Sequence, residues 1–279
     1  MTLTTAVDRT DQPDRPRDWR PRLVALDIDG TIVDAEGRIP DDLRAAVADA
    51  VASGALVVLS TGRGWHAVRD VFDALGLPPG PAVVSNGAVV VRYPPLRLDR
   101  VVTFDPRPAL EHIAAEYPEY LLGVEVIGKG YLVNRPFPDG ELLGDIVVAD
   151  LERLAAEPAT RVIVRDPNST VDDFVELAEK LGLGGVTYAV GYTAWLDIAP
   201  DGVDKASGLA QVCADAGISA ADVLAIGDGR NDIEMLRFAG RGVAVGDAPA
   251  VVQEAADHVT GTFADGGTTA ELRRWFPAR

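Results

Sequence analysis

The stretch LVALDIDGT, residues 23–31, decides the fold of this chain. Its first four residues are apolar, and an apolar run that ends in an acid and a glycine is typical of a buried strand that breaks into a loop. Along an extended chain Asp27 and Asp29 would point to opposite faces, so a turn at or after Asp27 must bring both carboxylates towards one site. Burying that much negative charge is costly without a cation. The stretch therefore predicts a divalent metal at a strand end, for which phosphate chemistry is the natural use.

Apolar strands and amphipathic helices alternate around this stretch. After the strand at 23–26 come a helical pattern over 41–53, an apolar run over 55–59, a helical segment over 65–75 and a third apolar run over 82–84. This is the βαβαβ rhythm of a parallel sheet. The rhythm resumes near the C-terminus with a helix at 205–216, a strand at 223–226, a helix at 232–239 and a strand at 242–245.

A different pattern separates these two parts. Over residues 91–197 the sequence shows short strand-like pieces, proline- and glycine-containing turns and one clear helix at 171–181, which is typical of an inserted α+β module. We therefore expect an α/β protein with a Rossmann-like, doubly wound parallel-sheet core, formed by residues 23–90 and 198–279, and an α+β domain inserted at 91–197. Residues 1–22 carry prolines and mixed charges without the apolar segment of a secretory signal, which predicts a flexible tail.

Composition narrows the class of partner. The 279 residues carry a formal net charge of −17, which would oppose nucleic acid and acidic membranes, because binding either normally needs a positive patch. No stretch approaches the roughly 18 consecutive apolar residues of a membrane helix. Cys213 is the single cysteine, which excludes intramolecular disulfides and thiolate zinc clusters. We expect a cytoplasmic protein with neither nucleic acid nor membrane as a partner; its oligomeric state is not predicted.

Four separated segments carry side chains suited to a metal-bound phosphate, and each ends an apolar strand or begins a helix. In a parallel sheet the carboxyl ends of the strands lie on one edge, which is where ligands bind in open α/β folds. We therefore expect the four segments to share one site. They are the pair Asp27 and Asp29, the stretch STGR at 60–63, Lys205, and the stretch GDGRND at 227–232.

These residue types match the needs of phosphomonoester hydrolysis. A carboxylate nucleophile forms an acyl phosphate and divides one difficult displacement into two easier ones. A magnesium ion between carboxylate and phosphate screens the repulsion of the two anions. A lysine and a hydroxyl can hold the remaining phosphoryl oxygens, while the second acid moves a proton to and from the reacting oxygens.

With these motifs the chain resembles phosphatases of the haloacid dehalogenase-like (HAD) superfamily, in the Cof-like branch with a large α/β cap, over about residues 23–272. The resemblance implies that Asp27 of the D-x-D-G-T signature is the nucleophile and Asp29 the general acid and base. It implies that Thr61 of the T-G-R segment binds the phosphate, with Gly62 beside it. Lys205 of the G-V-x-K segment would steady the phosphorylated intermediate.

The same resemblance implies a magnesium site and a covering domain. Magnesium would be held chiefly by Asp27, Asp228 and the backbone carbonyl of Asp29, with Asn231 and Asp232 of the G-D-x-x-N-D signature supporting it directly or through water. Asn86 would border the substrate site, and the inserted module would be the cap that covers it. Asp247 stands where the family commonly has asparagine, so the role of this acid stays open.

Several nearby side chains have an ordinary structural explanation. Arg63 is as consistent with a surface ion pair as with a phosphate contact. Trp65 is expected to pack into the core, as helical aromatic residues usually do. Trp195 and Tyr192 are weak candidates for substrate recognition. The histidines have no metal-ligand spacing and are expected at the surface or at a strand edge: His66, His112 and His258.

The sequence thus predicts a magnesium-dependent phosphatase for a small phosphorylated metabolite, such as a sugar phosphate or similar phosphomonoester, acting through phospho-Asp27. The nearest alternative is a phosphomutase acting on a hexose phosphate, which the motifs cannot separate from a phosphatase. A signalling receiver is disfavoured because it needs no leaving-group acid and usually has one domain of about 120 residues. A catalytically silent metabolite-binding protein is disfavoured by the complete set of acids, threonine and lysine.

Overall fold

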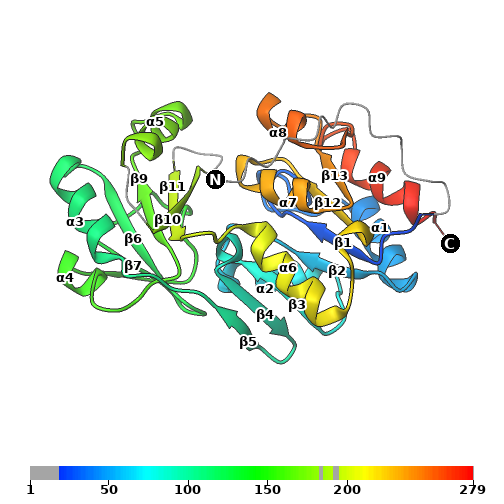
Figure 1. Ribbon diagram of the computed structural model, residues 1–279, viewed down its shortest axis with the longest axis horizontal. Coiled ribbons are helices and arrows are strands. Elements are labelled where there is room, and N and C mark those ends of the chain that lie inside the picture. Colours follow the sequence, from blue (N-terminus) through cyan, green and yellow to red (C-terminus); the bar gives the residue numbers. More distant parts are fainter. Residues whose placement is uncertain (1–18, 182–184, 191–194, 279) are drawn as a thin grey trace, which may run out of the picture.

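The computed structural model describes residues 19–181, 185–190 and 195–278, without the side chains of residues 179, 189 and 190. These residues form sheets of five, six and three strands. Figure 1 shows the five-stranded sheet with its helices on the right, the six-stranded sheet on the left and the three-stranded sheet at the lower centre.

The five-stranded sheet is parallel and has the order β14-β13-β12-β1-β2. β1 (Leu23–Leu26) lies between β2 (Leu56–Leu59) and β12 (Val223–Gly227), and β13 (Arg241–Ala244) and β14 (His258–Val259) continue beyond β12. Early in the chain β2 is added on one side of β1, and late in the chain β12, β13 and β14 are added on the other side. The strand order therefore reverses at β1, which is where open α/β sheets bind ligands.

Helices cover both faces of this sheet, because its strands are apolar on both faces. Successive residues of β1 alternate between two apolar clusters: Val24 and Leu26 belong to one, Leu23 and Ala25 to the other. The predicted doubly wound core is thus confirmed. Helices α1 (Asp41–Ala52), α2 (Trp65–Ala74) and α9 (Gly267–Trp275) contribute to the first cluster, and α6 (Lys205–Ala216), α7 (Ile233–Phe238) and α8 (Ala250–Ala255) to the second.

The strand predicted at 82–84 is β3 (Gly80–Val84), but most of its pairing is not parallel. β3 pairs antiparallel with β4 (Val89–Tyr93), and β4 pairs antiparallel with β5 (Arg97–Val101). Its link to the parallel sheet is one parallel bridge between Ser60 and Val83, beyond the end of β2. The reason is the short 3-10 turn η1 (Ser85–Gly87), which sends the chain straight back as a hairpin.

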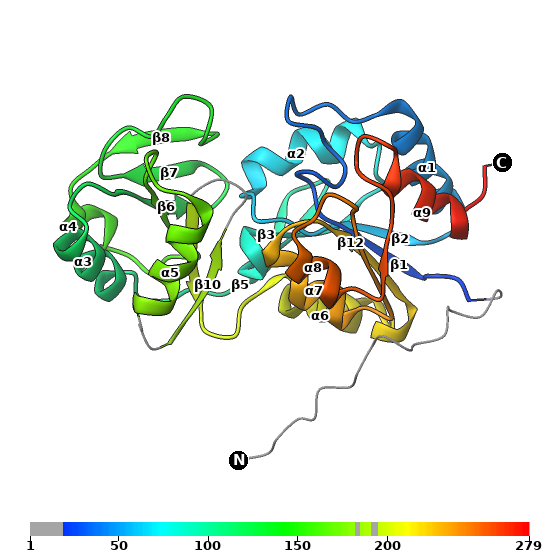
Figure 2. The same ribbon diagram turned by 90° about the horizontal axis from the view of Figure 1, so that it is seen from above.

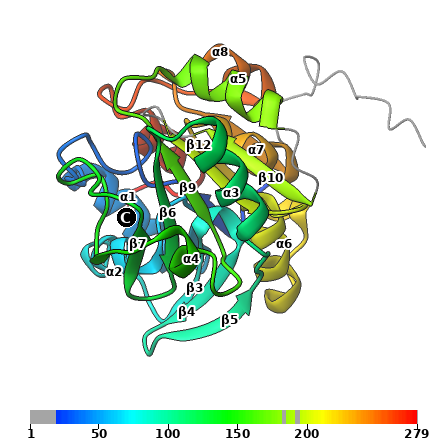
Figure 3. The same cartoon turned by 90° about the vertical axis from the view of Figure 1, so that its left-hand side faces the viewer.

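The six-stranded sheet belongs to the predicted cap and has the order β10-β11-β9-β6-β7-β8. Its described pairings are antiparallel except for the parallel pair β7 and β8. Figures 1 and 2 show α3 and α4 on the side of this sheet away from the core, and in Figure 3 these helices stand in front of it. The strands are β6 (Leu121–Val126), β7 (Gly130–Val133), β8 (Asp145–Val148), β9 (Val162–Arg165), β10 (Val186–Val190) and β11 (Trp195–Pro200). The cap helices are α3 (Arg107–Glu116), α4 (Leu151–Leu154) and α5 (Val171–Leu181).

Two short turns complete the core, η2 (Ala220–Asp222) before β12 and η3 (Arg230–Asp232) before α7. The cap boundaries expected at residues 91 and 197 both fall inside strands, because β4 pairs with β3 of the core and β11 runs on to Pro200. We propose that the cap begins after β5 and ends after β11. Within the described residues, no helix is long and apolar enough to cross a bilayer.

The last residues of the predicted flexible tail pack against the core. Trp19 contacts Trp275 edge-on with ring centroids 4.8 Å apart, and its Nε1 donates to the Ala221 carbonyl at 3.1 Å. The prediction of a loose tail is therefore wrong for residues 19–22, because the indole finds an apolar partner far along the chain. Residues 1–18 lie outside the described part of the structure.

Gly87 is expected to be essential for the turn after β3. It has φ +94°, and a Cβ on it would overlap the Asp204 carbonyl oxygen at the start of α6. Gly76 has a similar φ of +64°, but a Cβ there would meet no described atom within 4 Å. We expect Gly76→Ala to lower the free energy of unfolding by about 1–2 kcal/mol, the cost of the left-handed conformation. Gly87→Ala should cost about 4 kcal/mol, because the turn must also move off α6. Urea unfolding measures both, and equal losses would contradict this close approach.

Candidate active site

The predicted catalytic residues gather at the carboxyl ends of β1, β2 and β12 and at the start of α6. Asp27 directly follows β1, and the strand register places it beside Ser60, the residue after β2. Asp228 directly follows β12, on the other side of β1. Asp27 thus lies between the loop of Thr61 and the loop of Asp228, as expected for strand ends on one edge.

Lys205 joins two of these segments from a fully buried position. Its Nζ donates to Asp27 Oδ1 and to Asp232 Oδ1, both at 2.6 Å. A cation at the first residue of a helix is disfavoured by the helix dipole, so these two carboxylates explain its placement. Burial alone would lower the pKa of Lys205, but Asp232 and Asp27 outweigh burial and hold that pKa above its ordinary value. Lys205 is therefore charged in the folded protein.

Asp232 fixes the loop between β12 and α7. Its Oδ2 accepts hydrogen bonds from the backbone N–H groups of Asp228 at 3.0 Å and Gly229 at 2.8 Å. Its other oxygen accepts from Lys205. Both oxygens of Asp232 thus bind protein groups, and the consequence is a fixed position for Asp228.

Three buried carboxylates have the arrangement of a metal site. Oxygens of Asp27, Asp228 and Asp232 lie within 4.8 Å of one another. Thr31 Oγ1 donates to Asp228 Oδ1 at 2.9 Å, and a Cβ on Gly30 would overlap the other oxygen, Oδ2, so the glycine leaves that oxygen room. Carboxylate oxygens are the ligands that magnesium prefers. The residues present therefore fit a divalent cation.

The pKa values of two of these acids show the cost of burying them close together. Burial raises the pKa of Asp27 well above its ordinary value, although Lys205 opposes the rise. Burial, followed by repulsion from Asp232, raises the pKa of Asp228 to about 7. A bound divalent cation favours the ionised form of a carboxylate and would offset both effects.

Asp29 lies apart from the buried acids. Its side chain is 55% exposed and forms a two-point ion pair with Arg63, whose Nε donates to Asp29 Oδ2 at 2.9 Å and whose Nη2 donates to Oδ1. The ion-pair interpretation of Arg63 is thus the one present in the structure. The backbone N–H of Arg63 also donates to Thr61 Oγ1 at 3.1 Å, which holds that hydroxyl next to the pair.

Asn86 and Gly62 lie together beside Asn231. Asn231 Nδ2 donates to Asn86 Oδ1 at 3.0 Å, and a Cβ on Gly62 would lie 3.1 Å from the same oxygen. Asn231 therefore points its amide towards Asn86. Ser85 and Asn86 both have φ 51°. Successive non-glycine residues with positive φ are uncommon, and such backbone is found chiefly at functional sites.

Three buried charged residues of the cap, not identified from the sequence, contact this edge of the site. Arg161 Nη1 donates to the Gly62 carbonyl, Asp197 Oδ2 accepts from Asn86 Nδ2 at 2.8 Å, and Glu125 Oε1 accepts from Ser85 Oγ at 2.9 Å. The sequence pattern around these residues could have identified them as buried charges. Each stands in or next to an apolar run, as in VEV at 124–126 and LDI at 196–198, and a buried charge needs a partner.

The remaining candidates have structural roles. Trp65 packs in the core against Phe72 and Tyr93, as predicted. Asp247 is exposed and accepts from the backbone N–H of Phe263 at 3.0 Å, apart from the acid cluster. Trp195 Nε1 donates to Asp197 Oδ1 at 2.8 Å. Tyr192 lies outside the described residues.

The expected surface position is wrong for one histidine. The ring nitrogens of His66 are buried, and the ring stacks edge-on against Tyr131 of the cap with centroids 5.5 Å apart. The reason is that the first turn of α2 meets the cap sheet. His112 and His258 are exposed, as expected.

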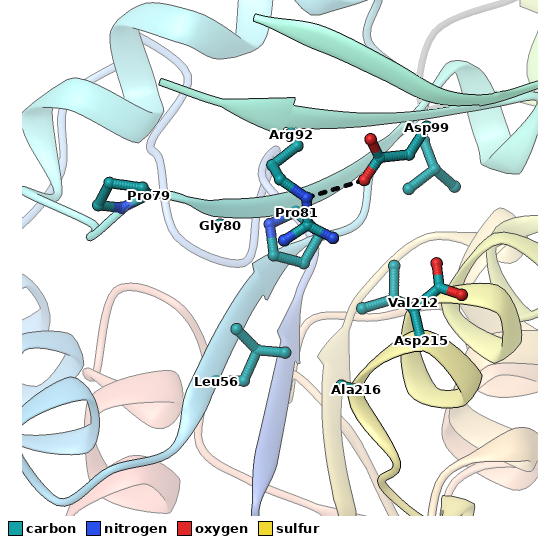
Figure 4. Close-up of a pocket in the computed structure, with 10 residues that line it drawn as sticks. Leu56, Pro79, Gly80, Pro81, Arg92, Asp99, Val212, Asp215 and Ala216 are labelled. Carbon is teal, nitrogen blue, oxygen red and sulfur yellow. Dashed lines mark hydrogen bonds and ion pairs between the residues drawn. The ribbon is translucent and has the colours of Figure 1, made fainter. Parts of the chain in front are cut away.

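A separate surface pocket lies between β2, β3, β4 and α6 (Figure 4). Arg92 Nε donates to Asp99 Oδ2 at 2.9 Å along its wall, and Leu56 and Val212 contribute apolar lining. None of the predicted site residues lines this pocket. It is therefore distinct from the acid cluster.

The comparisons with known proteins identify the family. The family model for haloacid dehalogenase-like hydrolases matches residues 24–102 and 145–272, and the chain belongs to this family. The chain is 25% identical to 5-amino-6-(5-phospho-D-ribitylamino)uracil phosphatase YcsE of Bacillus subtilis, over 91% of this chain and 95% of the relative. It is 31% identical to phosphoglycolate phosphatase of Aeropyrum pernix, over 91% of this chain and 92% of the relative.

A solved structure supports the fold. The structure of the HAD subclass IIB sugar phosphatase BT4131 superposes with a TM-score of 0.77 at 23% identity, covering 91% of this chain and 98% of that one. Together with the family match and the relatives, these findings make the protein a phosphatase, that is, a phosphoric monoester hydrolase.

Magnesium binding is expected to depend on Asp228. At one hundred times its Kd, Mg²⁺ should raise the free energy of unfolding of the wild type by about 2.7 kcal/mol. Asp228→Asn can keep the contact with Thr31 but loses a ligand charge, so most of this stabilisation should disappear. Asp247→Asn is the matched control, because Asp247 is an exposed acid outside the cluster. Thermal unfolding with and without Mg²⁺ gives the comparison, and equal stabilisation of all three proteins would contradict the assignment.

Proposed function

We propose that this phosphatase is magnesium-dependent and hydrolyses a small phosphorylated metabolite, such as a sugar phosphate or similar phosphomonoester, through phospho-Asp27. The observation that carries the proposal is the Lys205 contact with Asp27 at 2.6 Å, inside a cluster of carboxylates that fits a divalent cation. The relatives support the substrate class, since their names describe enzymes acting on small phosphorylated compounds.

In the first step, an Asp27 oxygen attacks phosphorus in line while the bond from phosphorus to the alcohol oxygen breaks. Lys205 and the Thr61 hydroxyl hold phosphoryl oxygens. Asp27, Asp228 and the backbone carbonyl of Asp29 would hold magnesium, which would supply positive charge to offset the repulsion between the anionic ester and the carboxylates. Asp232 and Asn231 keep the surrounding loop in place.

Asp29 moves the protons in this proposal. It takes up a proton from solvent, gives that proton to the leaving alkoxide as the bond to phosphorus breaks, and then takes one from the water that attacks phospho-Asp27, which releases inorganic phosphate. In the structure Arg63 binds both oxygens of Asp29. A phosphoryl group offers Arg63 a competing anion, so substrate binding would free Asp29 for proton transfer. Arg63, Gly62 and Asn86 then border the bound phosphate and its substituent.

Water is the proposed acceptor of the phosphoryl group, in place of the second sugar hydroxyl that a phosphomutase would use. The relatives reported above are named phosphatases, which supports hydrolysis. The proposed location is the cytoplasm, where the free thiol of Cys213 would stay reduced.

Asp27→Asn is expected to abolish catalysis, because a carboxamide is a poor nucleophile. Magnesium-dependent hydrolysis of 4-nitrophenyl phosphate should fall by more than about a thousandfold. Steady-state absorbance of the released nitrophenolate measures the rate, and circular dichroism checks that the variant is folded. A folded Asp27→Asn protein with wild-type turnover would rule out the phospho-Asp27 mechanism.

A further inference from the structure

Three buried charges lie where the cap meets the core, and we call Glu125, Arg161 and Asp197 the cap cluster. Glu125 belongs to β6, Asp197 to β11, and Arg161 directly precedes β9 between them. Each residue is at most 6% exposed. Their strand neighbours, including Val124 and Leu196, pack in the apolar cluster that contains the cap helices. Because strand residues alternate between faces, the cap cluster lies on the opposite face, towards the core.

The cap cluster is extensively hydrogen-bonded but keeps one unused donor. Arg161 Nη2 donates to the Tyr131 hydroxyl at 2.6 Å and Nη1 lies 3.3 Å from Asp197 Oδ2. Arg161 Nε is 3.6 Å from Glu125 Oε2, and among the described residues it has no hydrogen-bond partner. A buried donor without a partner is costly, so this group is available to a ligand.

The core residues that the cap cluster contacts all adjoin the phosphate site. Arg161 binds the carbonyl of Gly62, which follows Thr61, and Asp197 binds Asn86, which also binds Asn231. In-line attack by Asp27 places the leaving oxygen on the far side of phosphorus. The cap cluster contacts Gly62 and Asn86 at this edge of the sheet, so a leaving alcohol that extends from the site towards the cap would meet it.

The cap cluster carries more negative than positive charge. Asp197 accepts from the N–H groups of Asn86, Trp195 and Arg161, a set of donors that suits a carboxylate. Burial raises the pKa of Asp197, but Arg161 and the Trp195 N–H oppose the rise and favour the carboxylate. Two acids therefore share one guanidinium.

The neighbouring ionisable groups do not change this balance. Burial lowers the pKa of His66, so the ring is neutral at pH 7. Burial raises the pKa of Tyr131 to about 12, so the phenol is neutral as well. Arg165 is already paired with Glu141 at 2.8 Å on the same face of the sheet.

We propose that the cap cluster selects a neutral, polyhydroxylated leaving group and discriminates against one that carries a carboxylate. This inference rests on the proposed phosphatase function. Hydroxyls can donate to Glu125 and Asp197 and accept from Arg161 Nε, replacing the direct contacts between cap and core. A carboxylate cannot donate, and it adds a further anion to a region that is already negative.

Two matched pairs of substrates test the proposal: sorbitol 6-phosphate with 6-phosphogluconate, and glycerol 1-phosphate with 3-phosphoglycerate. The members of a pair differ in a terminal hydroxymethyl group against a carboxylate. With saturating Mg²⁺, kcat/KM of the wild type should be about tenfold or more higher for the neutral member, the effect of one charge in partly screened surroundings. Phosphate release measures the rates.

Two variants should shift this preference in opposite directions. Glu125→Gln removes a negative charge and can still bond Ser85 and Thr160, so the preference should fall by about tenfold. Arg161→Gln removes the positive charge, so the preference should rise. Arg165→Gln is the matched control, since it removes a guanidinium from the same face, and it should change the ratio by less than about twofold. A folding defect lowers both members of a pair together, so the ratio reports recognition.

A wild type that prefers the carboxylate members would overturn the proposal. So would shifts in Glu125→Gln and Arg161→Gln that equal the shift in Arg165→Gln, or turnover of 4-nitrophenyl phosphate with no activity on either pair. Absence of magnesium-dependent turnover even of 4-nitrophenyl phosphate would contradict the proposed function itself, which separates the two failures.

Discussion

The rest of the site depends on the buried contact of Lys205 with two carboxylates. An ammonium group without water is tolerated only beside anions, and Asp27 and Asp232 provide them at 2.6 Å each. Asp232 also holds the backbone of the loop that presents Asp228. One cation thus ties together the ends of β1 and β12 and the start of α6. Removing one partner of such a buried pair typically costs about 3–5 kcal/mol, so the same contact stabilises the fold and arranges the proposed nucleophile.

A second constraint is the left-handed turn at residues 85–87. It directs Ser85 and Asn86 away from β3 towards the cap, where they meet Glu125 and Asp197. Asn86 forms hydrogen bonds with two residues: Asn231, in the loop proposed to hold the metal, and Asp197 of the cap sheet. The positive-φ turn therefore connects the proposed phosphate site to the cap residues that we propose recognise the alcohol.

Many elements of the core and one helix of the cap could be predicted from the sequence because their signals are local. The strand Leu23–Leu26 and the helices Val171–Leu181 and Lys205–Ala216 have the predicted bounds. The gathering of Asp27, Lys205 and Asp228 also followed, since strand ends in a parallel sheet share one edge. Two predictions were wrong because they depended on which segments pair in the folded chain. β3 pairs mainly with β4 and not within the parallel sheet, and Trp19 of the predicted loose tail packs on Trp275.

The same limit applies to the cap side of the site. Glu125, Arg161 and Asp197 come from strands far apart in the sequence, and only the sheet order β11-β9-β6 brings them together. The pairing of Asp29 with Arg63 was equally hidden, because the side-chain direction after the turn at Asp27 is set by tertiary structure.

Borohydride trapping tests whether Asp27 is the nucleophile, because borohydride reduces an aspartyl phosphate to homoserine at the modified position. The enzyme would be mixed with Mg²⁺ and a phosphate ester that it hydrolyses. The reaction would be quenched with borohydride, and the modified residue would be located by peptide mass spectrometry. Homoserine is expected at position 27, and its formation should depend on both substrate and metal. Modification at a different aspartate, or unmodified Asp27 during active turnover, would contradict this assignment of the nucleophile.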